Sequence, residues 1–300
     1  AGWLASAQLI ILAVIAILLS RRISRLDKRL CALLGCCFGV AANIGAIWSE
    51  NPNVVFACKM VYGVGVGLLV ASSYSLTPLF SRPEKIVARI GMAMAVLFGL
   101  VTLLIPKLMA AYCAWAMNLV HLALMFVGLA AAVLLPAGIT SEASPCARVV
   151  RPLPGGVKGL LLTVLLVFAS QTAAISFAAV VGGRLGVSDS DLATAFMLSA
   201  FAMLPGAFLV DRLGNRLGYF RPLLGVFLLL IAVYIGMYCL KDVPMFLLAL
   251  VLINAVGLFA NAYLIGVIAK MDGIGRSTAI AGSITNLGMA FGPAIAGAAF

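Results

Sequence analysis

Charged residues are scarce in this sequence, which excludes an ordinary soluble domain. Only 10% of the 300 residues are charged and 64% are hydrophobic, whereas a soluble domain has about a quarter charged residues. There is one histidine, and none of the seven cysteines stands in a CxxC pair, so neither a metal centre nor a redox site is expected. The ATP-binding pattern G-x-x-x-x-G-K-[ST] is also absent. We therefore expect no cofactor and no enzymatic activity.

What the sequence does contain is a series of long apolar stretches. Crossing a bilayer takes about 20 consecutive apolar residues, and the segment must be helical because its backbone groups find no water there. The alternating pattern of a membrane barrel is absent. An all-α integral membrane protein with ten membrane-spanning helices is predicted. The spans are 4–20, 30–49, 54–77, 87–106, 109–135, 157–182, 190–210, 222–240, 243–269 and 277–300.

The basic residues are distributed unevenly between the loops. Most of the 20 lysines and arginines follow the odd-numbered spans, so these loops are expected to be cytoplasmic. The net charge of +11 then reflects topology and contact with anionic lipid, and a nucleic-acid partner is not expected. The longest break is rich in proline and divides the spans into two sets of five. The predicted organisation is an N-terminal helical bundle at 1–136, a cytoplasmic linker at 137–156 and a C-terminal helical bundle at 157–300.

Two short segments recur six spans apart. Arg21-Arg22-Ile23-Ser24-Arg25 follows the first span, and Asp211-Arg212-Leu213-Gly214-Asn215-Arg216 follows the seventh. Ala71-Ser72-Ser73-Tyr74 and Ala260-Asn261-Ala262-Tyr263 end the third and ninth spans. Elements an even number of spans apart face the same way, so the repeat is parallel and six helices long, which is a known transporter plan. We expect one further helix before the first span and one after the last.

Three segments resemble motifs of the major facilitator superfamily. Residues 207–216, which contain Asp211, Arg212 and Gly214, resemble its signature loop G-x-L-a-D-r-x-G-r. Residues 59–67 (Lys-Met-Val-Tyr-Gly-Val-Gly-Val-Gly) are similar to its fourth-helix motif, and residues 288–297 to its eleventh helix. The resemblance implies a two-bundle transporter fold, with helices two to eleven of twelve visible. In the loop after the first span, Arg21 stands where the family has aspartate.

The resemblance also implies where solute and gate residues lie. In the family, the first, fourth, seventh and tenth helices line a central cavity. Here these helices correspond to a lost helix and to the third, sixth and ninth spans. The candidate solute-binding residues on these spans are Lys59, Tyr62, Gln171, Asn254 and Asn261. The candidate gating loops contain Arg21, Arg25, Asp211, Arg212, Gly214 and Arg216.

Lys59 is unusual because every acidic residue lies in a loop or at the end of a span. Its Cα should be about 9 Å deep in the bilayer. One interpretation is that its side chain extends outward to the membrane surface. The other is a fixed positive charge on the cavity wall, which would favour an anionic solute, with Tyr62 one turn away. His121, three residues after Asn118, either titrates or bonds to a neighbouring helix.

The function predicted from these features is secondary active transport of a small organic solute, by symport or uniport and alternating access. Two alternatives remain: an efflux pump of the same superfamily, and a complete ten-helix carrier of the drug/metabolite (EamA-like) type, whose halves would be inverted. A membrane enzyme would need clustered histidines or acids. The expected partners are the solute, the lipid bilayer and a coupling proton or other ion. A monomer in the bacterial inner membrane, with multiple passes, is expected.

Overall fold

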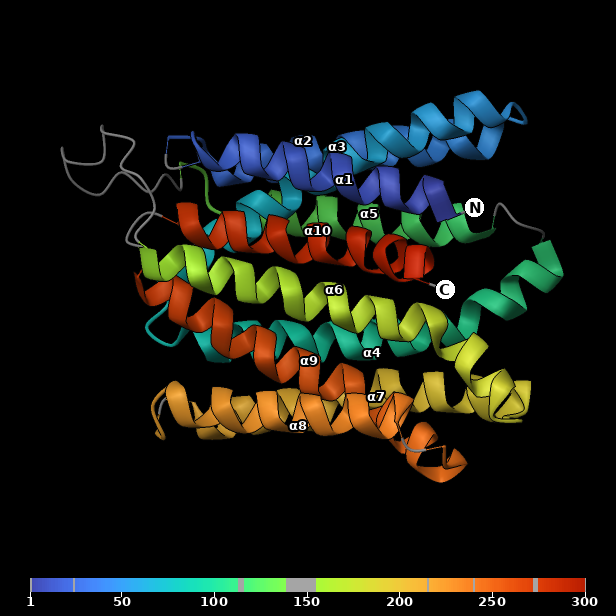
Figure 1. Ribbon diagram of the computed structural model, residues 1–300. Helices are drawn as coiled ribbons and strands as arrows, with labels where there is room; N and C mark the ends of the chain where they lie inside the picture. Colours follow the sequence, from blue (N-terminus) through green and yellow to red (C-terminus); the bar gives the residue numbers. More distant parts are fainter. Residues whose placement is uncertain are drawn as a thin grey trace.

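The computed structural model describes residues 2–23, 25–112, 116–138, 155–214, 216–239, 241–271 and 275–299. Within these ranges the regular structure is helical throughout (Figure 1). A short 3₁₀ helix, Thr77–Leu79, follows the third α-helix. The ten α-helices are α1 Gly2–Ser20, α2 Lys28–Trp48, α3 Pro52–Leu76, α4 Pro83–Tyr112, α5 Ala116–Leu134, α6 Gly155–Arg184, α7 Asp189–Leu213, α8 Phe220–Tyr238, α9 Val243–Met271 and α10 Arg276–Ala299.

Seven of these helices are long and apolar enough to cross a membrane, judged by length and composition over the described residues. They are α2, α3 and α5 to α9, and α1 adds a shorter apolar stretch, Ala7–Ser20. Large apolar side chains lie exposed along the outer helices, as Leu224, Leu228 and Ile231 do on α8. Such a surface is expected of helices that face lipid. The prediction of an all-α integral membrane protein is confirmed.

Two predicted boundaries around the fourth helix are wrong. The sequence suggested a span at 87–106 and a break before 109, but α4 starts at Pro83 and continues to Tyr112, and α5 begins at Ala116. The helix continues through residue 106 because membrane helices tolerate proline when neighbouring groups satisfy the freed backbone. The start at Pro83 follows the preference of proline for the first helical turn. Consequently Glu84 belongs to the first turn of the helix rather than to the loop before it.

Helix α2 begins at a capping aspartate. Asp27 caps α2, where its side chain accepts a hydrogen bond from the Arg29 N–H at 2.9 Å, and its other carboxylate oxygen accepts one from the Gly138 N–H at 3.2 Å. These bonds, the one from Gly138 first, lower the pKa of Asp27, because they stabilise the charged carboxylate. Asp27 therefore ties the start of α2 to the segment that follows α5.

The helices form two bundles, α1 to α5 and α6 to α10, whose packing repeats. Helix α1 packs on α3 as α7 packs on α9, and α2 packs on α3 as α8 does on α9. Between the bundles, α1 meets α10 as α7 meets α4, and α3 meets α10 as α9 meets α4. Each contact is therefore repeated when a helix is replaced by the one six positions along the chain. This is the packing of a parallel pseudo-two-fold repeat, as predicted. Residues 139–154 of the predicted linker lie outside the described residues, and the domain boundary stays a prediction.

Glycines on α3 allow its neighbours to approach closely, as expected for membrane helices. A Cβ on Gly63 would lie 2.8 Å from the Gln8 carbonyl oxygen of α1, and one on Gly65 would lie 2.6 Å from the Gly35 oxygen of α2. Because Gly67 repeats the contact of Gly63 with α1, successive glycines of the motif at 59–67 face α1 and α2 in turn. This part of the motif is therefore explained by packing.

The C-terminal ends of α1, α3, α5, α7 and α9 lie at one end of the molecule, on the left in Figure 1, and the marked termini lie toward the opposite end. We call the first of these the basic end, because most of the lysines and arginines are found there. Two hydrogen bonds between residues far apart in the sequence lie at this end. The Gly138 N–H donates to Asp27, and the Tyr263 hydroxyl of α9 donates to the Gly214 carbonyl oxygen. The sequence predicts that this end faces the cytoplasm.

Candidate functional site

Lys59 takes part in a polar cluster between α3 and α5. Its Nζ donates a hydrogen bond to Asn118 Oδ1 at 2.6 Å and lies 5.7 Å from the centroid of the Tyr62 ring. The Tyr62 ring in turn lies 5.6 Å from the ring of His121, which is one turn along α5 from Asn118. Lys59 is half-buried and Tyr62 is buried. The ammonium is thus held inside the N-terminal bundle by a neutral amide and an aromatic face.

Gln171 and Asn254 form a second, uncharged group inside the C-terminal bundle. Gln171 Nε2 donates to Asn254 Oδ1 at 2.9 Å and to the Ile253 carbonyl oxygen at 3.3 Å. Asn254 Nδ2 continues the chain to Ser199 Oγ at 2.9 Å. The amide of Gln171 fits against α9 because Gly257 has no side chain to occupy that space. These bonds connect α6, α9 and α7.

Asn261, the fifth candidate residue, reaches across to the other bundle. Its side chain is hydrogen-bonded to Tyr74 of α3, which is half-buried. Asn261 is itself 8% exposed, and its Oδ1 has no hydrogen-bond partner in the described part of the chain. The five candidate solute residues therefore occur in three separate groups: Lys59 with Tyr62, Gln171 with Asn254, and Asn261 with Tyr74.

The candidate gate residue Asp211 forms an ion pair across the bundles. Arg89 Nε of α4 donates to Asp211 Oδ1 of α7 at 2.9 Å. Arg89 is 61% exposed and Asp211 is 22% exposed, so solvent screens this pair and its contribution is about 1 kcal/mol or less. The pair lies at the basic end and includes Asp211, one of the gate residues that the family resemblance implied.

Gly214 ends α7 with a positive φ of 48°, which suits glycine, and its N–H bonds the Val210 carbonyl. Its own carbonyl oxygen accepts a hydrogen bond from the Tyr263 hydroxyl at 2.8 Å. The guanidinium of Arg212 lies 4.9 Å from the centroid of the Phe208 ring. Arg216 lines a pocket with residues of α4. The remaining gate candidates, Arg21 and Arg25, are exposed in the loop between α1 and α2.

A buried carboxylate also connects the bundles at this end. Glu84 in the first turn of α4 is fully buried, and its Oε2 accepts a hydrogen bond from the Tyr219 hydroxyl at 3.1 Å. Tyr219 lies just before α8. Burial and the adjacent Glu84 carboxylate raise the pKa of Tyr219 above its usual value, so the phenol stays protonated and can donate this bond at neutral pH.

Three glycines let the bundles interlock at the basic end. A Cβ on Gly282 would lie 2.7 Å from ring atoms of Tyr74, and one on Gly266 would lie 2.8 Å from Cβ of Glu84. Gly275 packs against the backbone of Ser75 with a φ of 76°. In each case an α9 or α10 glycine, or one in the loop between those helices, meets the N-terminal bundle. The basic end is therefore closed in this structure.

Glu84, Arg89 and Tyr219 join the two bundles in the structure, but none of them was a candidate site residue in the sequence. Glu84 was left outside the predicted span, which began at residue 87, and Arg89 was counted only among the basic residues near the third span. A proline followed by a glutamate is a common helix start, and this signal at Pro83 would have placed Glu84 inside the first turn. No local pattern identifies Tyr219 as the partner of Glu84, since the two are far apart in the chain.

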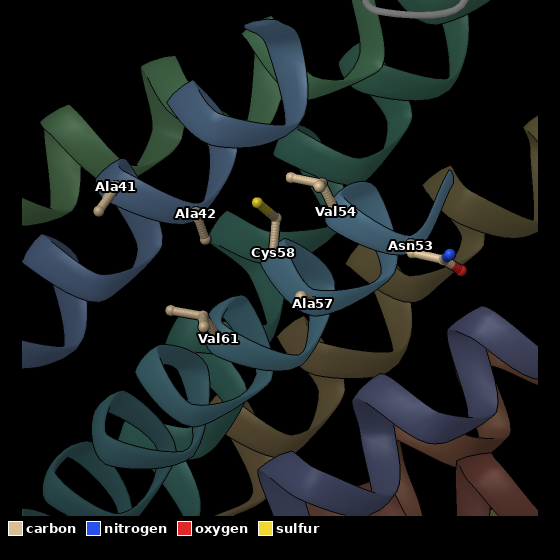
Figure 2. Close-up of a pocket in the computed structure, with 7 residues that line it drawn as sticks. All are labelled: Ala41, Ala42, Asn53, Val54, Ala57, Cys58 and Val61. Carbon is tan, nitrogen blue, oxygen red and sulfur yellow. The ribbon is translucent and has the colours of Figure 1, made fainter. Parts of the chain in front are cut away.

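An apolar groove of about 390 Å³ lies between α2 and α3, and Lys59 is not among its lining residues. Figure 2 shows Ala41 and Ala42 of α2 on one side and Cys58 and Val61 of α3 on the other. Its lining is mostly apolar side chains, so it offers few groups that could orient a polar solute. Over the ranges that the structure describes, no three His, Cys, Asp or Glu residues come together as metal ligands.

Comparison with known proteins agrees with this architecture. A family model described as the Major Facilitator Superfamily matches residues 1–293. The human organic anion transporter MFSD10 (TETRAN) shares the fold with a TM-score of 0.74 and 20% identity over 98% of this chain and 76% of that one. FucP, an MFS transporter in the outward conformation, gives a TM-score of 0.74 and 15% identity over 99% and 81%. A search among curated proteins found no significant match.

Proposed function

Because the chain belongs to the major facilitator superfamily, we propose that it is a secondary active transporter that moves a small organic solute by alternating access. Family and fold together support a membrane transporter. The parallel packing of the two bundles does not fit the inverted halves of a ten-helix drug/metabolite carrier.

The observation that carries the mechanism is the contact between the bundles at the basic end. Arg89 with Asp211, Glu84 with Tyr219 and Tyr74 with Asn261 each join one bundle to the other there. These bonds are few and separable, so the end can open when the bundles rock apart. A carrier needs such an interface, because solute must be released on one side while the other is closed. We infer that the structure represents the state in which the basic end is shut.

Lys59 supports an anionic solute. Its side chain has a neutral partner, Asn118, and among the described residues no carboxylate pairs with it. A lysine inside a membrane protein keeps its charge only where water or a partner compensates it. An anionic solute could take the place of Asn118 Oδ1. We propose that Lys59 and Tyr62 hold the anionic group, while Gln171, Asn254 and Asn261 contribute hydrogen bonds from the opposite bundle as the bundles move.

The test is uptake by purified protein in proteoliposomes, with a panel of small organic anions and neutral analogues. Lys59→Gln, which removes the charge, should reduce anion uptake at least about tenfold, because losing one partner of a desolvated charge pair costs about 2–5 kcal/mol. Lys59→Arg should retain part of it, since the charge survives in a different geometry. Lys158→Gln removes an exposed charge at the start of α6 and serves as the control. Unchanged uptake in Lys59→Gln would sink the proposal for this residue.

Orientation and location remain predictions from the sequence. If the basic end is cytoplasmic, a single cysteine at Ser141 should resist an impermeant maleimide added to intact cells, whereas one at Asp189 should react. The reverse labelling pattern would invert the orientation. Residence in a bacterial inner membrane and a monomeric state are likewise proposed, and fractionation and gel filtration of the purified protein test them.

A further inference from the structure

A polar pocket lies at the basic end, between the two bundles. Its volume is about 370 Å³. The N-terminal bundle contributes residues from the start of α4 and the loop before it, and the C-terminal bundle contributes the ends of α7 and α9. The residues that matter here are Arg82, Glu84, Lys85, Gly214, Arg216 and Lys270. None of them belongs to the proposed solute site.

The charges around this pocket do not balance. Four of the lining side chains are basic and one, Glu84, is acidic. Glu84 is buried and accepts its hydrogen bond from Tyr219 rather than from a lysine or arginine. The nearby Asp211 is occupied by Arg89. Within the ranges that the structure describes, no ion pair joins a carboxylate to any of the four basic residues.

The fold brings these basic groups together in a specific way. The hydrocarbon chain of Lys85 lies across the end of α7, where a Cβ on Gly214 would be 2.7 Å from Lys85 Cε. Lys270 Nζ lies 4.8 Å from the centroid of the Tyr219 ring, which itself is held by Glu84. Lys85 and Lys270 are thus positioned by neighbours from the opposite bundle or from the adjoining loop, and Arg82 and Arg216 extend from the exposed rim.

We propose that this pocket binds a phosphate group, either free phosphate or the phosphate of an anionic phospholipid. A phosphate carries enough charge and enough acceptor oxygens to bond several lysines and arginines at once. The volume accommodates such a group together with water. The pocket is polar and lies at the ends of membrane helices, where both sources of phosphate are present. Glu84 is the one acidic residue of the lining, so the four basic residues leave the pocket with a net positive charge.

Binding has a consequence for the gate, and this consequence rests on the proposed function. Arg82 and Lys85 move with the N-terminal bundle, whereas Arg216 and Lys270 move with the C-terminal bundle. All four surround one space only while the basic end is closed. A ligand that binds one of two conformations better shifts the population toward it. Phosphate therefore favours the closed basic end and slows transport.

The experiment uses the full chain in nanodiscs, with its native cysteines replaced and spin labels at the exposed positions Leu79 and Leu217. Inorganic phosphate is titrated into nanodiscs of phosphatidylcholine, and a parallel sample contains phosphatidylglycerol without added phosphate. The distance distribution between the labels reports closure of the basic end. The variant Lys85→Gln/Lys270→Gln is compared with Arg22→Gln/Arg221→Gln, which loses the same charge at the same end but outside the pocket.

We expect phosphate to raise the closed population in the parent and in the Arg22/Arg221 control. The concentration needed should rise at least about tenfold in the Lys85/Lys270 variant, as expected for lost charge-assisted hydrogen bonds. A shift with phosphatidylglycerol alone identifies the lipid as the source. If neither sample shifts, or if the pocket variant responds as the control does, the proposal is overturned. Should Lys85→Gln/Lys270→Gln not be monodisperse, Arg82→Gln/Arg216→Gln at the exposed rim replaces it.

Failure of this proposal can be distinguished from failure of the proposed function. Phosphate binding that depends on Lys85 and Lys270 stands even if Lys59→Gln leaves uptake unchanged. Conversely, uptake could be lost in Lys59→Gln while phosphate has no effect on the label distances. That result supports the proposed transport function and overturns only the phosphate site.

Discussion

Tyr74 and Tyr263 occupy matching positions in the two halves of the repeat, yet they bond to different parts of the molecule. Tyr74 of α3 is hydrogen-bonded across the bundle interface to Asn261. Tyr263 of α9 stays within its own bundle, where its hydroxyl bonds the Gly214 carbonyl. The loops differ in the same way: Asp211 pairs with the opposite bundle, whereas Arg21 is exposed.

The polar groups inside the two bundles differ as well. In the C-terminal bundle, the neutral side chains of Gln171, Asn254 and Ser199 bond to one another. In the N-terminal bundle, the charged Lys59 contacts Asn118 and the face of Tyr62, and no carboxylate pairs with it among the described residues. The comparison teaches that the repeat sets the positions of the helices, while their side chains give one bundle a charge and the other a chain of neutral hydrogen bonds. Four predictions sharpen or break this division of roles.

The largest effect is expected from Gly282→Leu. Because a Cβ at this position would already lie 2.7 Å from the Tyr74 ring, a leucine forces the bundles apart at the basic end. Overpacking of this kind costs about 1–3 kcal/mol, and only the closed state bears it. The closed population, measured by spin labels at Leu79 and Leu217, should fall about tenfold. Gly225→Leu is the control, since nothing lies within 4 Å of a Cβ there. An unchanged distance distribution in Gly282→Leu would show that the interface yields without opening.

A smaller effect on the closed population is expected from Tyr74→Phe, and none from Tyr263→Phe. Tyr74→Phe removes a hydrogen bond between the bundles, worth about 0.5–1.5 kcal/mol, and should lower the closed population several-fold. Tyr263→Phe removes a bond inside one bundle, so it should lower the melting temperature without changing the label distances. The comparison fails if both variants shift the distances equally.

The amide network should stabilise the C-terminal bundle in the state shown here, before the bundles move and solute binds. Gln171→Leu and Asn254→Leu, alone and combined, form a double-mutant cycle in thermal unfolding. Their coupling should be about 0.6 kcal/mol, the average for hydrogen bonds between membrane helices. Both single variants should fold and stay monodisperse in gel filtration. A coupling near zero would mean that Gln171 and Asn254 do not bond to each other in the folded protein.

The smallest effect is expected at the ion pair on the surface. Asp211→Asn should change the closed population less than about twofold, because an exposed pair contributes only a few tenths of a kcal/mol. The reversed pair Arg89→Asp/Asp211→Arg should restore whatever is lost, and raising the salt concentration should remove the difference. Arg21→Ala at the matching position of the other half should have no effect on the distances. A large, salt-independent effect of Asp211→Asn would mean that the pair is the main lock.

Much of the fold could be predicted from the sequence because the bilayer restricts the choices. Apolar runs in a membrane have to be helices, and the recurrence of Ala71–Tyr74 at Ala260–Tyr263 indicates a parallel repeat. Helix α4 was the exception, since residue 106 reads as a break in a soluble protein but not in a membrane helix. Glycines at alternating positions of residues 59–67 predicted close packing, and the structure shows α1 and α2 against them.

The candidate site was less predictable, for a physical reason. The sequence identified Lys59 as a charge in an apolar span, because burial of a lysine is costly wherever the span lies. Its partner Asn118 comes from a helix 59 residues away, and no local pattern encodes that distance. For the same reason Arg89, Glu84 and Tyr219 remained unassigned until the bundles were placed side by side.

The sequence by itself therefore determined the helices, their repeat and the family, since each depends on the residues of one segment and on the solvent around it. Only the tertiary structure decided which polar side chains meet: Lys59 with Asn118, Gln171 with Asn254, and Asn261 with Tyr74. It also decided that the basic end is closed. Hydrogen bonds and ion pairs act over a few ångströms, so they depend on how whole helices pack rather than on any segment alone.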